Sequence, residues 1–392
     1  MYIIMGIKQL NLFFKNHLTN PKCIQTIHTS TLKDKTIAID TSIYLYKFMC
    51  AIKNTCVDIY SQDGIVISHI QAILNKVFGL LKLKIKPIFV FDGKSPEAKQ
   101  DTMQKRSEKK SEAKSQLTSF RNRISEICRI MKTPPETSED IMHYKRLFVE
   151  LVEVRNNLKK ALKKTVGFST DQSDECKHLL KIMGIPYVTA ISEADPQCSH
   201  LVKTEKAFAV ASEDMDILTF GTKHLITGLG SKDTCKIYDL NLILADLKIS
   251  YMQFVDICIL LGCDYTCTIR GLGIKKILNE IKENVNIEGI IKSKKYIIPE
   301  DFDYKLARKM FTNPSTVETN YDWNVPNYLQ LKVFLQTNYS YTEDEIGRIS
   351  DVLKGGYYSV ISGEKSIAQY QKDCSAFNRA RNNIISFESD ED

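Results

Sequence analysis

No stretch of this sequence is both uncharged and apolar for long enough to cross a bilayer, so the residues predict no transmembrane segment. Met1 to Leu10 is too short and too polar for a secretory signal peptide, and we expect none. The chain also lacks a C-x-x-C pair with histidines nearby, which argues against structural zinc; its closest cysteines are Cys263 and Cys267. Eleven cysteines, an odd number, without a signal favour reduced thiols in the cytosol or nucleus.

The composition is that of an ordinary soluble protein, with 43% hydrophobic and 26% charged residues and no internal repeat. The 392 residues suffice for one large or two medium domains. The net charge of +7 is unevenly distributed, because residues 94–170 carry 18 Lys and Arg against 10 Asp and Glu. A positive charge confined to one segment indicates a polyanionic partner. The alternative is a solvated helical face, the commoner meaning of a charge run.

Acidic residues follow several predicted strands. Glu213, Asp214 and Asp216 come directly after the apolar run 207–210, where they would repel one another unless protons or cations neutralise them. The alternative for this segment alone is that the acids cap the start of a helix. The strand predicted at residues 36–40 ends on an acid as well, and Asp92 follows the strand predicted at residues 87–91.

Short strands alternate with helical segments, which predicts an α/β fold with a central, mainly parallel sheet and helices on both faces. Ligands of such sheets bind beyond the carboxyl ends of the strands, so Asp40, Asp92 and Asp214 should converge. Five segments supply seven carboxylates without a matching His or Cys set, and oxygen ligands select Mg²⁺ or Mn²⁺. Two such ions roughly 4 Å apart hydrolyse phosphodiesters. The seven are Asp40, Asp92, Glu193, Asp195, Asp214, Asp216 and Asp264.

The basic segment has a helical pattern. Residues 96–130 and 137–164 are helix-prone, and Pro134-Pro135 separates them. This pattern predicts an antiparallel helical pair, or a loop with helical pieces. The apolar residues at helical spacing in the second half are Tyr144, Leu147, Phe148, Leu151, Val154 and Leu158. Further on, Gly271 and Gly273 precede a helix in a turn whose amides can approach a phosphate, although such turns are often plain connectors.

A series of motifs resembles those of flap endonucleases of the XPG superfamily, in the family's order, from Met5 to about Trp323. They are Met5-Gly-Ile7, Ala38-Ile-Asp40, Val90-Phe-Asp-Gly-Lys94, Lys105-Arg-Ser-Glu108, Asp174-Glu-Cys-Lys-His-Leu-Leu180, Met183-Gly-Ile-Pro-Tyr187, Ser192-Glu-Ala-Asp195, Glu213-Asp-Met-Asp216, Ile259-Leu-Leu-Gly-Cys-Asp-Tyr265 and Ile269-Arg-Gly-Leu-Gly273. The resemblance implies a PIN-like, XPG-type nuclease fold with a helical arch and a helix–hairpin–helix. It also implies cleavage of 5′ flaps on branched DNA, with 5′–3′ exonuclease activity, by two Mg²⁺ ions that Mn²⁺ can replace.

The resemblance also assigns roles to residues. The seven carboxylates take the positions of the metal-binding acids, and Lys99 and Arg106 those of the basic pair at the base of the arch. Tyr46 takes the position of an aromatic that stacks on a base near the cut, with a core tyrosine as the alternative. Gly271 and Gly273, with Lys275 and Lys276, fall in the helix–hairpin–helix that grips the duplex, usually with a bound K⁺.

The expected organisation follows from the same match. Residues 5–110 and 171–300 form the N-terminal and internal nuclease regions, the latter including the helix–hairpin–helix. Residues 111–170 form an arch longer than the family's usual one. Residues 301–385 form a helical region, and residues 386–392 an acidic, disordered tail. A monomer is expected, in the nucleus or the cytoplasm.

The chain departs from the family pattern at four points. Met1 to Ile4 precede the family's usual start, so initiation at Met5 is an alternative. Asp195 stands where the family commonly has Glu, and the shorter side chain changes its reach toward a metal. No sliding-clamp box appears near the C-terminus, and the lysine-rich nuclear signal is missing there. A compact chain with these losses is typical of a homologue from a large DNA virus, for which the nucleus would be that of the host.

Three other functions remain open. One is an exonuclease, bubble or junction specificity within the superfamily, although the motif from Glu213 to Phe220 favours the flap branch. Another is a non-catalytic scaffold that binds branched DNA; such scaffolds tend to lose acids, whereas all seven positions are filled here. The third is a nuclease acting on RNA with the same metal site.

Overall fold

The computed structural model describes residue 7 and residues 9–52, 58–61, 63–94, 99–230 and 233–361, without the side chains of residues 100–102, 105, 106 and 361. The tail predicted for residues 386–392 and the motif's Met5 and Gly6 lie outside this part of the chain. Within it, no helix is both long enough and apolar enough to cross a membrane. Every cysteine that the structure describes is a free thiol.

A seven-stranded sheet, counted over the described residues, forms the centre of the protein in the order β1-β7-β6-β5-β2-β3-β4. Its neighbours pair in parallel except for β7, which runs antiparallel to β6 and β1. The predicted mainly parallel sheet is therefore confirmed. The strands are β1 (Ile24–His28), β2 (Thr36–Asp40), β3 (Lys86–Phe91), β4 (Tyr187–Thr189), β5 (Ala209–Ala211), β6 (His224–Thr227) and β7 (Thr234–Asp239).

Three central strands set the position of the acids. β2, β3 and β5 are almost fully buried, as expected for parallel strands covered on both faces. Asp40 is in register with Val90, and Ile39 with Ala211. Asp92 and Asp214 follow Val90 and Ala211 by a few residues, so all three acids emerge at the same carboxyl edge of the sheet.

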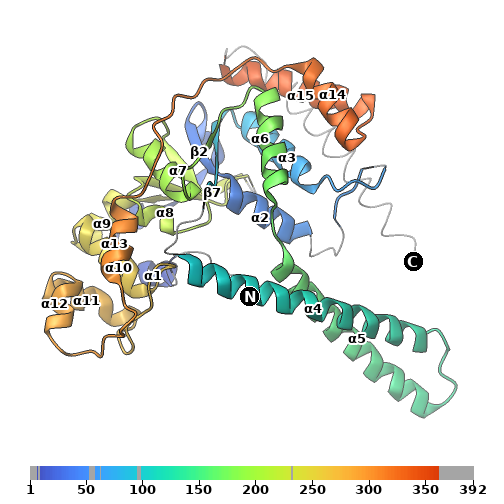
Figure 1. The fold of residues 1–392 in the computed structure, drawn as a ribbon, viewed down its shortest axis with the longest axis horizontal. Helices are drawn as coiled ribbons and strands as arrows, with labels where there is room; N and C mark the ends of the chain where they lie inside the picture. The colour runs from blue at the N-terminus through green and yellow to red at the C-terminus, as the bar shows by residue number, and fades with distance from the viewer. Residues whose placement is uncertain are drawn as a thin grey trace.

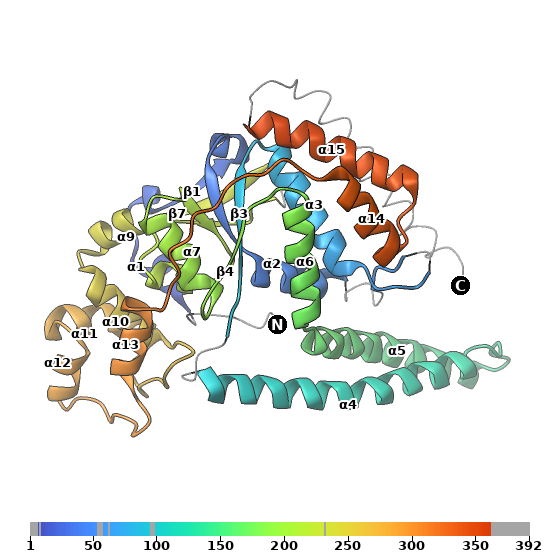
Figure 2. The ribbon, with the colours of Figure 1, turned by 45° about the horizontal axis from the view of Figure 1, so that its top comes forward.

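Helices cover both faces of this sheet (Figures 1 and 2). Adjacent residues of β2 point to opposite cores, with Ala38 in one and Ile37 and Ile39 in the other. The first core includes residues of α1 (Leu10–His17), α7 (Ala194–Lys203), α8 (Asp216–Thr219), α9 (Leu240–Leu247), α10 (Tyr251–Leu261), α11 (Ile274–Asn284), α12 (Ile287–Lys292) and α13 (Tyr304–Thr312). The second includes residues of α2 (Thr41–Ile52), α3 (Ser68–Lys82), α6 (Thr170–Ile182), α14 (Tyr328–Tyr339) and α15 (Glu343–Ile361).

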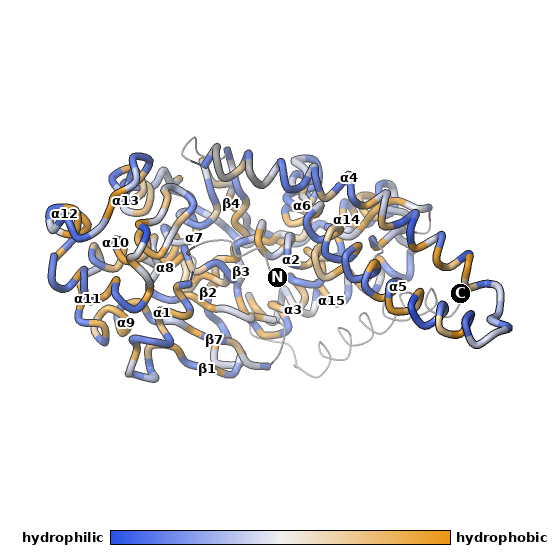
Figure 3. Tube along the Cα trace, turned by 90° about the horizontal axis from the view of Figure 1, so that it is seen from below, coloured by the Kyte–Doolittle hydropathy of each residue, from blue (hydrophilic) through white to orange (hydrophobic). Residues whose placement is uncertain are grey.

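The remaining helices, α4 (Gln100–Ile130) and α5 (Ser138–Thr165), form an antiparallel pair that projects from the body (Figures 1 and 2). Thr137 begins α5 with a capping box, in which its hydroxyl and the Asp140 carboxylate bond each other's backbone amides. The pair mixes hydrophilic and hydrophobic residues along its length (Figure 3). The helical-pair alternative is thus the correct one for the basic segment.

The pair closes on a narrow seam of its own, in which Ile127, Leu147 and Leu151 are buried. Phe148 was expected in the apolar stripe of α5, but it is 59% exposed. Two helices packed only on each other bury one narrow stripe each, and the residue next to Leu147 in the chain lies about 100° around the helix from it. The prediction for Phe148 was therefore wrong.

Candidate active site

Asp40 is one of the buried acids at the carboxyl edge. It ends β2 and is 4% exposed. Its Oδ1 accepts a hydrogen bond from the Ile43 amide at 3.1 Å, in the first turn of α2. Its Oδ2 accepts one from the Ser212 hydroxyl at 2.8 Å. These two bonds fix both oxygens and hold the carboxylate at the junction of β2 with β5.

A second set of acids lies where β3 meets the start of α7. Oδ1 of Asp92 accepts a hydrogen bond from the Ala194 amide at 2.8 Å. This bond places Asp92 beside Glu193, the residue immediately before α7, and beside Asp195 in the helix's first turn. Oδ1 of Asp195 is buried and has no hydrogen-bond partner among the described residues. A buried carboxylate oxygen in that state requires a proton or a cation.

The turn after β5 supplies two more acids. Asp214 and Asp216 are 7% and 3% exposed, and Oδ1 of Asp214 accepts a hydrogen bond from the Asp216 amide at 2.9 Å. Asp216 in turn accepts a bond from the Ile7 amide. Glu213 lies elsewhere, because its Oε1 accepts a bond from Gly228 at 2.8 Å and pairs with Lys47 at 3.3 Å. Only two of the three clustered carboxylates therefore join the site.

Lys99 is the cation at the centre of these acids. It is the residue immediately before α4 and is 8% exposed. Its Nζ lies 2.7 Å from Oε1 of Glu193 and 3.5 Å from Oδ2 of Asp264. Tyr265 donates a hydrogen bond to the other oxygen of Glu193 at 2.8 Å, and Lys99 Nζ lies 4.9 Å from the centre of its ring. Glu193 is thus held from two sides.

Burial and mutual repulsion raise the pKa of the inner acids. Burial, followed by the charge of Asp92, raises the pKa of Asp40 to about 7. Burial likewise raises the pKa of Asp195, Asp214 and Asp216, and neighbouring carboxylates raise the pKa of each further. Burial alone would lower the pKa of Lys99, but Glu193 and Asp264 outweigh it and hold that pKa above its usual range. These interactions link all seven predicted carboxylates into one group.

This group suits a hard divalent cation. Its donors are all carboxylate oxygens, they repel one another, and one buried oxygen of Asp195 lacks a partner. Lys99 supplies a single positive charge against seven acids. Among the described residues, no three acid, His or Cys side chains are already arranged as a metal cage. The residues therefore fit Mg²⁺ in donor type and charge, with Lys99 between two of them.

Stability without metal should depend on pH. Folding raises the pKa of Asp40 to about 7 from an unfolded value of about 3.9, so the folded protein holds that proton more tightly. The proton on Asp40 therefore stabilises the folded state fully below about pH 4, and this contribution to the free energy of unfolding is lost as the pH rises through 7. We expect the melting temperature in chelator to fall as the pH rises from about 4 to about 7, because the folded protein loses on the order of a few kcal/mol of stability over that range.

Two comparisons test this pH dependence. Saturating Mg²⁺ should flatten the profile, and Asp40→Asn should reduce the slope in chelator by the share that Asp40 contributes, while Asp195, Asp214 and Asp216 retain the rest. A melting temperature that is constant from about pH 4 to about 7 in chelator would contradict the raised pKa of Asp40.

Comparison with known proteins identifies the family. The XPG N-terminal domain matches residues 5–113, and the XPG I-region matches residues 184–264. Flap endonuclease 1 of Caenorhabditis elegans is 35% identical over 352 residues, which cover 87% of this chain and 84% of that protein. The Danio rerio flap endonuclease 1 is 33% identical with the same coverage. The chain belongs to the flap endonuclease family.

Solved structures agree with the family's fold. Flap endonuclease-1 from Methanococcus jannaschii superposes with a TM-score of 0.61 at 25% identity, covering 90% of this chain and 99% of that one. The catalytic core of Rad2 in complex with DNA substrate gives a TM-score of 0.63 at 21% identity, covering 89% and 100%, and supports the fold alone. These structures confirm the XPG-type fold that the motifs predicted for this member of the flap endonuclease family.

The other predicted site residues of this family member lie on α2, on α4 and around the start of α11. Tyr46 is half-buried on α2, and Arg106 lies on α4 with its side chain outside the described part. Gly271, Gly273, Lys275 and Lys276 are exposed around the start of α11.

Two residues that hold the acids in place were not predicted from the sequence. The Ser212 hydroxyl donates a hydrogen bond to Asp40 and accepts one from the Asp214 amide at 3.1 Å. The Tyr265 hydroxyl donates one to Glu193. Each is adjacent to or near a predicted acid, at the end of a strand or of α10. A polar side chain at those positions was the available signal.

Proposed function

We propose that this chain is a structure-specific DNA endonuclease that hydrolyses phosphodiester bonds at 5′ flaps of branched DNA and also acts as a 5′–3′ exonuclease. The observation that carries the proposal is the group of seven linked carboxylates around buried Lys99, at the carboxyl edge of an XPG-type sheet. Relatives named flap endonuclease 1 share 33–35% of their residues with it over most of both chains. The DNA role favours a nuclear location, and we infer that the enzyme acts as a monomer.

Seven residues would hold two Mg²⁺ ions, or Mn²⁺ in their place: Asp40, Asp92, Glu193, Asp195, Asp214, Asp216 and Asp264. When bound, such ions activate a water and neutralise charge on the leaving oxygen of the phosphodiester. The protein's own contribution is to orient the acids. Ser212 and the Ala194 amide fix Asp40 and Asp92, and Tyr265 fixes Glu193.

The basic pair would act on the phosphate that is cut. Lys99 is held among the acids by Glu193 and Asp264, so its charge is already placed where negative charge develops on the reacting phosphate. Arg106 lies seven residues, about two helical turns, further along α4. We assign Arg106 the same role as Lys99, because it lies on the same helix, further from the acids.

The start of α11 is the proposed grip on the duplex. Gly271 has a φ of +85°, which a residue with a side chain rarely adopts, and a Cβ at Gly273 would meet no atom within 4 Å. The open backbone there lets amides approach a phosphate, with Lys275 and Lys276 alongside. A K⁺ ion at this turn and stacking of Tyr46 on a base near the cut belong to the same proposal.

The function is tested with a panel of labelled 5′-flap, nicked, bubble and four-way DNA substrates in Mg²⁺, in Ca²⁺ and in chelator. We expect cleavage of the flap at its base in Mg²⁺, and binding without turnover in Ca²⁺, whose looser coordination misplaces the attacking water. Preferred cutting of the bubble or four-way substrate would favour the other XPG branches. Binding to all four substrates without any cleavage in Mg²⁺ would favour a non-catalytic scaffold that binds branched DNA.

The arch formed by α4 and α5 should hold the single-stranded flap. Basic residues cluster at its base and along both helices, and contacts of this kind go mainly to phosphates. Replacing residues 129–158 with a short Gly/Ser linker should reduce the rate of flap cleavage more than the rate of cleavage at a nick. It should also make the rate of flap cleavage less dependent on salt concentration. Rates on both substrates across a salt series measure this.

Phe148→Ser serves as the control for this deletion, because it changes an exposed apolar residue but leaves the seam and every charge in place. Equal cutting of both substrates by the deleted protein at every salt concentration would exclude a role of the arch in holding the flap.

A further inference from the structure

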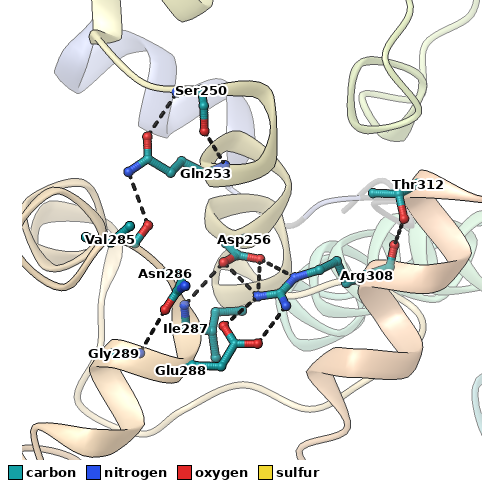
Figure 4. A network of polar contacts seen from close by, with 10 residues as sticks. All are labelled: Ser250, Gln253, Asp256, Val285, Asn286, Ile287, Glu288, Gly289, Arg308 and Thr312. Atoms are coloured by element: carbon teal, nitrogen blue, oxygen red, sulfur yellow. Dashed lines mark hydrogen bonds and ion pairs between the residues drawn. The ribbon is translucent and has the colours of Figure 1, made fainter.

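A second group of linked charges lies around Arg308, and one of its members, Asp256, is buried (Figure 4). Nε and Nη2 of Arg308 each donate to Asp256 at 2.9 Å. Nη1 and Nη2 donate to Glu288 at 2.7 and 3.0 Å. Asp256 is 2% exposed, so this guanidinium neutralises a charge that water cannot reach.

Arg308 thereby joins three helices that are separate in sequence. Asp256 lies in the middle of α10, Glu288 in the first turn of α12, and Arg308 itself in α13. Oδ2 of Asp256 also accepts a hydrogen bond from the Ile287 amide at 3.2 Å. A planar guanidinium held by two carboxylates fixes orientation as well as distance, which a lysine ammonium does not.

The same residues hold the far end of α11. The chain leaves α11 at Asn284 and enters α12 at Ile287, and Gln253 of α10 donates a hydrogen bond to the Val285 carbonyl at 3.1 Å. Figure 4 shows Gln253 and Asp256 bonding this connection from one side of α10. The angle between α10 and α11 is therefore set at both ends, by the Gly271 turn at one and by the Asp256 contacts at the other.

These two helices carry two different parts of the proposed enzyme. α10 ends at Leu261, five residues beyond Asp256, and the chain continues through Gly262 to Asp264. α11 begins at the exposed turn proposed to grip the duplex. Successive phosphates of one DNA strand rise by only about 3.4 Å, so a small change in the angle between these helices offers a different bond to the carboxylates.

We propose that Arg308 is a positioning residue that fixes the duplex grip at the start of α11 relative to Asp264, and so selects which phosphodiester is cut. It touches neither the DNA nor the reacting atoms, and acts through Asp256 and Glu288. This inference rests on the proposed flap cleavage.

The test compares Arg308→Lys with the wild type on one end-labelled 5′-flap substrate, with products resolved to the nucleotide. The lysine keeps the charge beside Asp256 but loses the planar bridge to Glu288. We expect a second product one nucleotide from the normal cut, and a single-turnover rate lower by roughly tenfold to a hundredfold. The dissociation constant for the flap substrate, measured in Ca²⁺, should stay close to that of the wild type.

Two further variants separate positioning from stability. Leu353→Ala removes a fully buried side chain of α15 and should lower the melting temperature without moving the cut. Glu288→Gln retains the Asp256–Arg308 pair and should shift the cut even if Arg308→Lys fails to fold. A single wild-type product from Glu288→Gln and from folded Arg308→Lys would overturn the inference. Failure of the wild type to cut flaps would instead refute the proposed function.

Discussion

Asp214→Ala and Asp92→Ala should each abolish cleavage of a 5′ flap in Mg²⁺ while binding to the same DNA is retained. Asp214 is 7% exposed and interacts with Asp216 and Asp264, and Asp92 interacts with Asp40. Removing either acid takes away a carboxylate that would bind the metal ions. The single-turnover rate should therefore fall below about a thousandth of the wild-type rate. Rapid-quench cleavage and fluorescence anisotropy measure the two quantities separately.

Glu213→Gln is the matched control for Asp214→Ala. Glu213 is the adjacent carboxylate, but it contacts Gly228 and Lys47 instead of the other acids. We expect it to cut at nearly the wild-type rate. Near-normal turnover by Asp214→Ala or Asp92→Ala in Mg²⁺ would refute the metal assignment.

Lys99→Met should lower turnover far more than affinity, because Lys99 lies among the acids and reaches the phosphate only when the substrate is seated. The methionine keeps the length and the apolar stem of the side chain and removes the charge. We expect a loss of about a hundredfold in single-turnover rate at saturating Mg²⁺. Lys99→Arg, which retains the charge in a larger head group, should recover part of it.

The ion pairs of Lys99 with Glu193 and Asp264 allow a competing role, in which the lysine only neutralises the acids before metal binds. In that case Lys99→Met would lower the Mg²⁺ concentration required for half-maximal cleavage and leave the single-turnover rate at saturating Mg²⁺ unchanged. Lys109→Met, a change of an exposed lysine on the same helix, controls for loss of positive charge. Weaker DNA binding by Lys99→Met at an unchanged saturated rate would contradict the turnover role.

The sequence predicted the centre of the sheet well, for a physical reason. β2, β3 and β5 are buried on both faces, so each reads as a short apolar run, and the acid that follows marks its end. The convergence of Asp40, Asp92 and Asp214 followed from the rule that parallel strands place their carboxyl ends together.

The antiparallel edge of the sheet was not predicted. β1 is largely exposed and reads as Ile-Gln-Thr-Ile-His, and its partner β7 lies about two hundred residues further along the chain. An edge strand needs few apolar residues, so its composition resembles that of a loop. Residues 301–385 were expected to form a helical region, but the bounds of α13 to α15 within it were not predicted, because these helices are stabilised by packing against distant helices such as α3 and α10.

The candidate site divides in the same way. The identities of the seven acids were available from their order and spacing, and comparison with relatives supports the family to which those motifs belong. The resemblance placed Lys99 at the base of the arch, but its ion pairs with Glu193 and Asp264 were not predicted, because they depend on where α4 begins relative to the end of α10. The outward turn of Glu213 depends on the amide of Gly228, which only the folded sheet brings near.

The connection between β3 and β4 has a consequence for how such enzymes diverge. These strands are adjacent and parallel, and all of α4, α5 and α6 lies between Phe91 and Tyr187. The sheet fixes both ends of that crossover, and doubling the length of a connection costs only about 0.6 kcal/mol in closure entropy. Insertions there leave the register of Phe89 with Tyr187 unchanged. The reach of the arch and the chemistry of the sheet edge can therefore evolve independently, so that a lineage changes the branched substrate it accepts without moving a single carboxylate.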